Sequence, residues 1–105
     1  MKITGEELKN KIKSGETFIV DIYAEWCGPC KMMSPIIENL SNELKKEDSS
    51  VGVYKLDIEE NKNLAVDLGV RSIPNIKVYK DGENVINKVG LLNEQQLRGL
   101  VKEVV

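Results

Sequence analysis

The chain contains two cysteines, Cys27 and Cys30, which are separated by two residues and directly follow its only tryptophan, Trp26. Two thiols at this spacing can close a disulfide and open it again. In thiol–disulfide exchange, one thiolate attacks a substrate disulfide to form a mixed disulfide, and a second thiol resolves that intermediate. The thiolate is the reactive form, yet a thiol with an ordinary pKa of about 8.5 is only roughly 3% ionised at pH 7. A redox role therefore requires surroundings that stabilise a thiolate.

The elements on either side of the cysteines can supply that stabilisation. Residues 17–24, TFIVDIYA, form an apolar, β-branched run that predicts a strand buried on both faces. A helical pattern starts at the motif, so Cys27 lies just before the first turn, where unpaired backbone N–H groups and the helix dipole favour a thiolate. Cys30 lies one turn further on, which lets the two sulfurs meet. We therefore predict that Cys27 is the exposed nucleophile and Cys30 the resolving thiol.

Two structural interpretations compete with redox chemistry. A structural disulfide around a four-residue loop would add only about 2 kcal/mol of stability, and a cytosolic protein would keep it reduced. A pair of buried, inert thiols fits poorly with Gly28-Pro29, because these two residues favour a turn over a core segment. A Cys-x-x-Cys motif between a strand and a helix instead favours a redox function.

The absence of histidine excludes several other uses of the cysteines. A Cys-His hydrolase and a zinc site of the Cys/His type both need an imidazole. Two cysteines alone cannot complete a tetrahedral zinc site unless two chains pool them. Covalent c-type haem needs a histidine after the second cysteine, where this chain has Lys31. We therefore expect no metal, and no cofactor other than the redox-active disulfide itself.

Asp21 and Lys55 are charged residues within otherwise apolar strand patterns. Burying an unpaired carboxylate is costly, so an ion pair between the two is the structural explanation. If the strands are neighbours, burial raises the pKa of Asp21 and the charge of Lys55 opposes that rise. The Asp21 carboxyl could then accept the proton of Cys30 as Cys30 attacks. We favour this catalytic role over a purely structural pair.

Trp26 also has two interpretations. It could simply cap the hydrophobic core, or it could form a flat apolar cover that shields the thiols and touches the substrate. We favour the second interpretation.

The composition indicates one globular domain spanning residues 1–105. Hydrophobic residues make up 41% of the chain, charged residues 30%, and the formal net charge is −2. These values give no basic footprint for nucleic acid or a membrane surface, and no apolar run approaches the roughly 20 residues of a membrane span. The first ten residues lack the apolar core of a secretory signal, and the initial Met argues against a removed one. We expect a cytoplasmic monomer with no nucleic-acid or membrane partner.

The hydrophobic periodicity predicts four helices and at least four strands. The helices are expected over residues 4–15, 27–50, 61–69 and 93–105, and the strands over 17–24, 51–58 and a hairpin at 75–90. Thr4 and Glu7 form a capping-box pattern, Pro35 should kink the second helix, and Asp81-Gly82 should turn the hairpin. The strand–helix–strand order implies a parallel pair with a right-handed crossover. The result is an α/β domain with a mixed sheet of four or five strands, in which a first strand at residues 1–3 is short or absent.

Four segments together resemble the thioredoxin family over nearly the whole chain: VDIYAEWCGPCKMMSPII, VYKLDIEEN, RSIPNIKVYKDGE and VGLL. The resemblance implies a three-layer α/β/α fold, attack by Cys27, resolution by Cys30, and a buried pair of Asp21 and Lys55. It also implies a cis Ile73-Pro74 bond, whereas the base rate of roughly 5% alone favours trans. The substrate groove implied by the resemblance consists of Trp26, Gly28, Pro29, Ile58, Ile73, Pro74, Gly90 and Leu91.

The resemblance further implies a general protein-disulfide reductant that a thioredoxin reductase or an equivalent enzyme re-reduces, with disulfide-containing proteins as clients. Tyr23, Ser72 and Asn75 depart from residues that are common in the family, which affects partner preference. Two alternatives stay open: an oxidant or isomerase, and a subunit that uses the same groove only to bind a protein. Gly-Pro between the cysteines, where oxidants and isomerases usually carry a His, favours the reductant.

Overall fold

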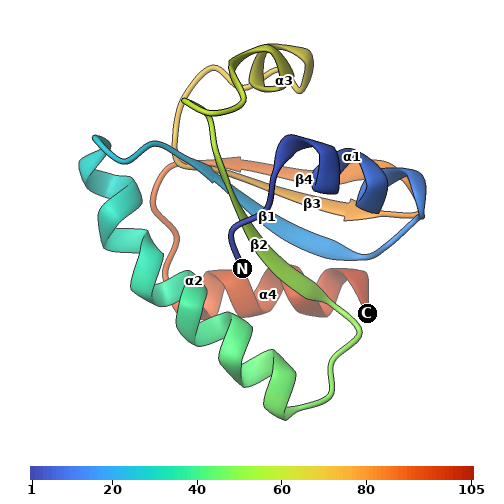
Figure 1. The fold of residues 1–105 in the computed structure, drawn as a ribbon. Helices are drawn as coiled ribbons and strands as arrows, with labels where there is room; N and C mark the ends of the chain where they lie inside the picture. Colours follow the sequence, from blue (N-terminus) through green and yellow to red (C-terminus); the bar gives the residue numbers. More distant parts are fainter.

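A four-stranded mixed sheet lies between two layers of helices in the computed structural model, which describes all residues from 1 to 105 (Figure 1). The strands are β1 (Phe18–Tyr23), β2 (Gly52–Asp57), β3 (Asn75–Lys80) and β4 (Glu83–Val89). The helices are α1 (Gly5–Lys13), α2 (Gly28–Lys46), α3 (Lys62–Asp67) and α4 (Glu94–Val104). The order of the elements and the α/β/α architecture agree with the sequence predictions.

Strand β1 is an interior strand of the sheet. The strand order is β2-β1-β3-β4, and β1 pairs parallel with β2 and antiparallel with β3. All six residues of β1 are buried, which explains why its sequence is apolar without alternation. Its carboxyl end leads directly to the two cysteines, so a strand held on both sides by its neighbours positions the motif.

The expectation that the first strand is short or absent is confirmed. Residues 1–3 make only an isolated parallel bridge between Lys2 and Lys55. The N–H of Ile3 donates to the Lys55 carbonyl at 2.9 Å, and the Lys55 N–H donates to the Met1 carbonyl at the same distance. The chain then leaves the sheet, because the capping box of Thr4 starts α1 immediately afterwards.

The two faces of the sheet are covered by different helices. In Figure 1, α1 and α3 lie on one side of the sheet, and α2 and α4 lie on the other. The core under α2 and α4 contains Ile19, Val53, Ile76 and Val78 of the sheet with Met33, Ile37, Leu97 and Val101 of the helices. The core under α1 and α3 contains Phe18, Val20, Ile22, Leu56 and Tyr79 with Leu8 and Leu64. None of the four helices is long and apolar enough to cross a membrane.

The predicted element boundaries hold where a local signal defines them. The β3–β4 hairpin turns at Asp81 and Gly82, which both have positive φ angles of 54° and 83°. Gly69 follows α3 with a φ of 74°, as expected for the residue after a helix C-cap. Helix α2 continues through Pro35, and the kink expected there stays a prediction.

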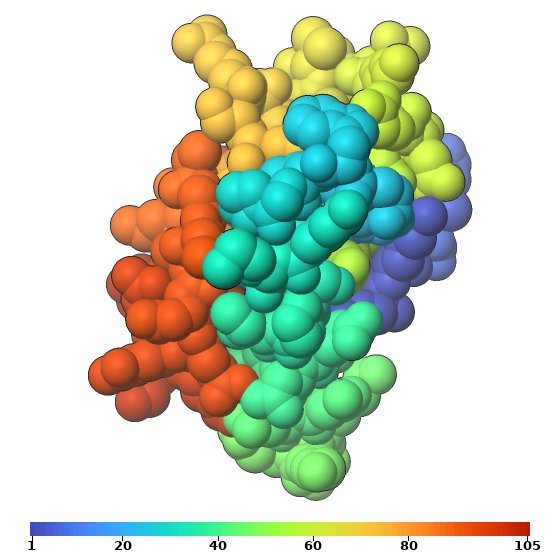
Figure 2. Space-filling view, turned by 90° about the vertical axis from the view of Figure 1, so that its left-hand side faces the viewer, coloured from blue at the N-terminus to red at the C-terminus, as the bar shows by residue number.

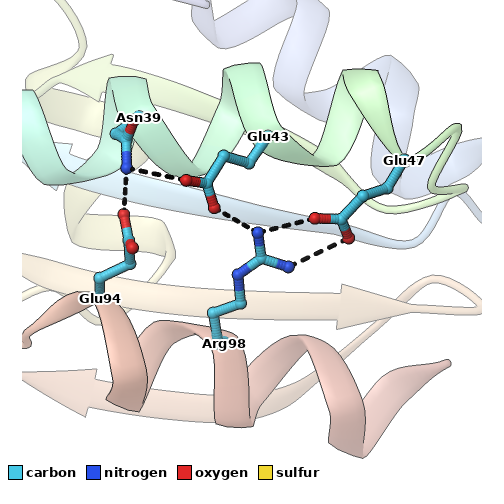
Figure 3. Close-up of polar contacts among 5 residues, drawn as sticks. All are labelled: Asn39, Glu43, Glu47, Glu94 and Arg98. Atoms are coloured by element: carbon cyan, nitrogen blue, oxygen red, sulfur yellow. Dashed lines mark hydrogen bonds and ion pairs between the residues drawn. The ribbon is translucent and has the colours of Figure 1, made fainter.

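Helices α2 and α4 are joined at the surface by one polar network (Figure 3). The guanidinium of Arg98 on α4 donates to both carboxylate oxygens of Glu47, the C-cap residue of α2, at 2.8 and 3.0 Å, and also to Glu43 on α2. Asn39 on α2 donates to Glu43 on the same helix and to Glu94 on α4. The bond from Arg98 holds the pKa of Glu47 below its usual value. This network connects the C-terminal half of α2 to α4, and the cysteines lie at the N-terminal end of α2.

Candidate active site

Cys27 and Cys30 form a disulfide at the N-terminus of α2, with their Cα atoms 5.2 Å apart. Cys27 is the N-cap residue of the helix, and the backbone N–H of Cys30 donates to its sulfur at 3.2 Å. Gly28 is the first helical residue and Pro29 the second. Proline is tolerated at this position because an N–H there would have no partner within the helix, and the N–H of Cys30 is the first-turn donor that reaches the sulfur of Cys27.

The expected exposure of Cys27 is wrong for this disulfide state. The exposed fraction is 5% for Cys27 and 3% for Cys30, so both residues are buried. The two cysteines form a buried cluster with Tyr23 and Ala24, and the partly buried Ile58 and Ile73 pack against this cluster. We therefore attribute the expected difference in reactivity between the two thiols to the helix N-terminus, which donates to the Cys27 sulfur, and not to solvent exposure.

Trp26 is 66% exposed, which overturns the interpretation that it caps the core. Its indole Nε1–H donates to Oε1 of Glu59 at 2.6 Å, across 33 residues of sequence. Glu59 also pairs with Lys62 at 3.6 Å. The bond from Trp26 is the main cause that lowers the pKa of Glu59. Sequence reasoning did not identify Glu59, because no local pattern links a carboxylate after β2 to the tryptophan.

The Ile73-Pro74 peptide bond is cis, as the resemblance implied and against the base rate. The Ile73 carbonyl oxygen lies 4.0 Å from the sulfur of Cys27. The Pro74 carbonyl accepts a 2.9 Å hydrogen bond from the N–H of Gly90, whose φ is 99°, a conformation that favours glycine. Leu91 follows Gly90 and is 45% exposed. The structure thus brings the 73–74 and 90–91 segments together and places the former against the disulfide.

The space-filling view agrees with this arrangement. In Figure 2, the start of α2 (cyan) lies between the yellow-orange segment that precedes β3 and the yellow-green segment that follows β2. Ile73 belongs to the first of these segments and Ile58 to the second, and both contact the buried cluster that contains the cysteines. Residues from three separate parts of the chain therefore surround the disulfide.

Asp21 and Lys55 are direct neighbours in the parallel β1–β2 register, on the sheet face that α2 covers. They do not form the expected ion pair, and this prediction is wrong. Asp21 has no exposed surface, and neither of its carboxylate oxygens has a hydrogen-bond partner. The Lys55 ammonium instead donates to Ser34 Oγ at 2.7 Å and lies 4.5 Å from the ring centroid of Tyr23. The lysine side chain is long enough to reach these partners at the edge of the core, where Lys55 and Ser34 are only partly buried. Its charge stays better hydrated there than it would beside the fully buried Asp21.

The electrostatics of Asp21 follow the predicted direction. Burial raises its pKa from 3.8 to about 6, and the charge of Lys55 opposes that rise. A carboxyl with a pKa near 6 is ionised at neutral pH and is a stronger base than an ordinary aspartate. This environment suits a group that accepts a proton.

A small cavity of about 70 Å³ lies beside the disulfide. Its walls are formed by Tyr23, Ala24, Glu25, Cys30, Lys31, Ser34 and Lys55. Cys30 and Lys55 therefore face the same small space, although they come from different elements. No group of three His, Cys, Asp or Glu side chains is arranged to hold a metal ion.

Comparisons with known proteins agree with this geometry. The family model described as Thioredoxin matches residues 1–103. A thioredoxin of Rickettsia felis is 45% identical over 85% of this chain and 82% of its own length. A thioredoxin of Staphylococcus epidermidis is 40% identical, with 92% and 89% covered.

Solved structures show the same similarity in three dimensions. A mutant thioredoxin from Halobacterium salinarum superimposes with a TM-score of 0.83 at 36% identity, covering 98% of this chain and 88% of its own. Plasmodium falciparum thioredoxin gives a TM-score of 0.85 at 30% identity, covering 99% and 98%. With its four-stranded mixed sheet, four helices and a Cys27–Cys30 disulfide at the start of α2, the chain belongs to the thioredoxin family of thiol–disulfide oxidoreductases.

Proposed function

We propose that the protein is a general reductant of protein disulfides, with the whole chain acting as one monomeric domain. The observation that carries this proposal is the contact between the Cys30 N–H and the Cys27 sulfur at the start of α2. A helix N-terminus that donates to one sulfur stabilises negative charge on it, which is what an attacking thiolate needs. The redox group is then the protein's own pair of cysteines, without a cofactor or metal.

The reaction starts from the dithiol form. The Cys27 thiolate attacks one sulfur of the substrate disulfide, and the other substrate sulfur leaves as a thiolate that takes up a proton. The Cys30 thiol then transfers its proton to the Asp21 carboxylate, either directly or through a water molecule, and attacks the Cys27 sulfur of the mixed disulfide. The second substrate thiolate leaves. Two electrons have moved to the substrate, and the protein ends with the Cys27–Cys30 disulfide.

The substrate binds as an extended segment beside the disulfide. The Ile73 backbone lies close to Cys27 and supports strand-like pairing with such a segment. The groove of this proposal is formed by Trp26, Gly28, Pro29, Ile58, Ile73, Pro74, Gly90 and Leu91. Trp26 and Leu91 are exposed apolar side chains, which fits client proteins of varied sequence.

A reductant must be returned to its dithiol form after each turnover. We infer that a thioredoxin reductase or an equivalent enzyme does this, and that the protein works in the cytoplasm, where thiols are kept reduced. One structure similar to this chain, with a TM-score of 0.84, concerns thiol resolution in yeast mitochondrial 1-Cys peroxiredoxin through glutathione and thioredoxin systems. Peroxide-reducing enzymes are therefore reasonable clients to test.

The decisive experiment combines an activity with a potential. The purified dithiol protein should reduce the interchain disulfides of insulin, and its reduction potential should lie near that of thioredoxins, about −270 mV. A potential near −120 mV, the range of a strong oxidant, would overturn the proposal. A protein that binds client proteins but does not reduce them would instead support the binding-subunit alternative.

A further inference from the structure

Three groups near the Lys55 ammonium could interact with it: the Ser34 hydroxyl, the Tyr23 ring and the Asp21 carboxylate. It interacts with the first two. It donates to Ser34 Oγ at 2.7 Å and lies over the ring of Tyr23. The third candidate, Asp21, is its direct neighbour in the strand register but keeps both oxygens without a partner. A fully buried, unpartnered carboxylate next to a lysine is an unusual arrangement, because opposite charges at this spacing attract strongly.

The position of the ammonium has a chemical consequence. Lys55 and Cys30 line the same cavity of about 70 Å³, whereas Asp21 does not line it. In the proposed resolving step, a proton moves from the Cys30 thiol to Asp21, so negative charge moves from the carboxylate to the sulfur. An ammonium held in the cavity favours the thiolate product. An ammonium paired with Asp21 would favour the starting carboxylate and make it a weaker base.

We propose that Ser34 is a positioning residue whose hydroxyl, together with the ring face of Tyr23, holds the Lys55 ammonium beside Cys30 and away from the Asp21 carboxyl. This inference rests on the proposed function. The Ser34 hydroxyl makes no hydrogen bond to either sulfur; it accepts from Lys55 and acts through that residue. It lies one helical turn after Cys30 on α2, so the same helix presents the resolving thiol and the group that directs the lysine.

Few charged or titratable groups surround Lys55 and Asp21. Around the cavity they are Tyr23 and Lys55 from the sheet, Glu25 from the loop before the motif, and Cys30 and Lys31 from α2. On β3, the residue that faces Asp21 in register is Ile76, which is apolar. The α4 residues under this face are the apolar Leu97, Leu100, Val101 and Val104. Lys55 is therefore the only cation whose charge acts clearly on Asp21.

The test measures the titration of Asp21 directly in the oxidised protein, by NMR of the ¹³C-labelled aspartate carboxyl. Ser34→Ala removes the acceptor, and the freed ammonium turns to Asp21. The Asp21 midpoint should then fall by about one pH unit or more below the wild-type value. Ser34→Thr keeps a hydroxyl and should leave the midpoint unchanged. Ser41→Ala is the matched control, because Ser41 lies on the same helix but makes no hydrogen bond to Lys55.

A double-mutant cycle shows whether Ser34 acts through the lysine. In a Lys55→Gln background, Ser34→Ala should no longer move the Asp21 midpoint. An unchanged midpoint in Ser34→Ala alone, or an equal shift with and without Lys55, would overturn the inference. If Ser34→Ala does not fold, the Lys55→Gln variant alone tests the inference. A rise of the Asp21 midpoint by less than about one pH unit supports a lysine held away from Asp21. A larger rise would refute the inference.

The kinetic readout is the rate at which the mixed disulfide is resolved. At pH 7, Ser34→Ala should slow this step roughly twofold to fivefold without changing the first attack by Cys27, because only the proton acceptor is weakened. An equal loss in both steps would indicate a merely structural role. Failure of the wild-type protein to reduce insulin would overturn the proposed function alone, because the carboxyl titration reads the position of Lys55 without any substrate.

Discussion

The indole N–H of Trp26 donates a 2.6 Å hydrogen bond to the carboxylate of Glu59, which joins the loop before α2 to the loop after β2. The ring is 66% exposed, so this single bond and few other contacts set its orientation. It holds one wall of the proposed substrate groove in place before a client arrives. Such preorganisation reduces the ordering cost of binding.

We expect Glu59→Ala to raise the KM for a protein disulfide roughly twofold to tenfold, the range of one hydrogen bond, with little change in kcat. The fluorescence anisotropy of Trp26, the only tryptophan, should fall because the ring gains freedom. Lys62→Ala is the control, since it removes the other contact of Glu59 but leaves the indole bond. An unchanged anisotropy in Glu59→Ala would show that the bond does not hold the ring.

The same bond should depend on pH. Because the pKa of Glu59 is lowered in the folded protein, the stabilisation from its ionised form is present above the ordinary Glu pKa and is lost as pH falls through the lowered value. Trp26 fluorescence should therefore change below about pH 4. Glu59→Gln should show no such transition, and a transition that persists in this variant would have to come from another group.

Asp21→Asn should stabilise the oxidised protein in a pH-dependent way. The pKa of Asp21 is raised by burial to about 6, so its ionisation destabilises the fold by up to roughly 3 kcal/mol above pH 6, and this penalty disappears below about pH 4. Some of the gain is lost, because the amide is also buried without a partner. Urea unfolding should therefore show a gain of about 1–3 kcal/mol at pH 8 and none at pH 4; equal stabilities at pH 8 would contradict the assigned ionisation.

Cys27 should react first with a limiting alkylating reagent. In the dithiol protein, the N-terminal donors of α2 favour the thiolate at Cys27, the N-cap residue. Iodoacetamide labelling near pH 7, followed by peptide mapping, should find most of the label on Cys27. The two cysteines are nearly equally buried in the disulfide form, so we base this preference on the helix N-terminus and not on solvent exposure. Preferential labelling of Cys30 would reverse the two roles.

Cys30→Ser should trap clients as mixed disulfides on Cys27, because the resolving attack is removed while the first attack remains. The adducts should appear on non-reducing gels and disappear with dithiothreitol. Cys27→Ser is the matched control, and it should trap few or none. Turnover of Cys30→Ser at the wild-type rate would contradict a two-thiol mechanism for this protein.

Much of the molecule could be predicted from the sequence because its signals are local. The capping box at Thr4, the Asp81-Gly82 turn and the glycine after α3 each depend on a few neighbouring residues, and the structure confirms them. Hydrophobic periodicity determined which helix faces are buried. The placement of Cys27 at a strand–helix junction followed from the order of the elements alone.

The tertiary structure alone decided how the side chains around the site are partnered. The sequence pattern predicted that Asp21 and Lys55 could meet if their strands were neighbours, and the two strands are neighbours. It could not show that the Lys55 ammonium donates to Ser34 and not to Asp21. That choice depends on the competition between ion pairing and desolvation at the margin of the core, where a long side chain has several partners within reach. The bond from Trp26 to Glu59 likewise joins two loops whose proximity no local pattern encodes. Local rules thus determined the elements and the position of the thiols, whereas packing between distant segments determined the hydrogen bonds and the charges that act on them.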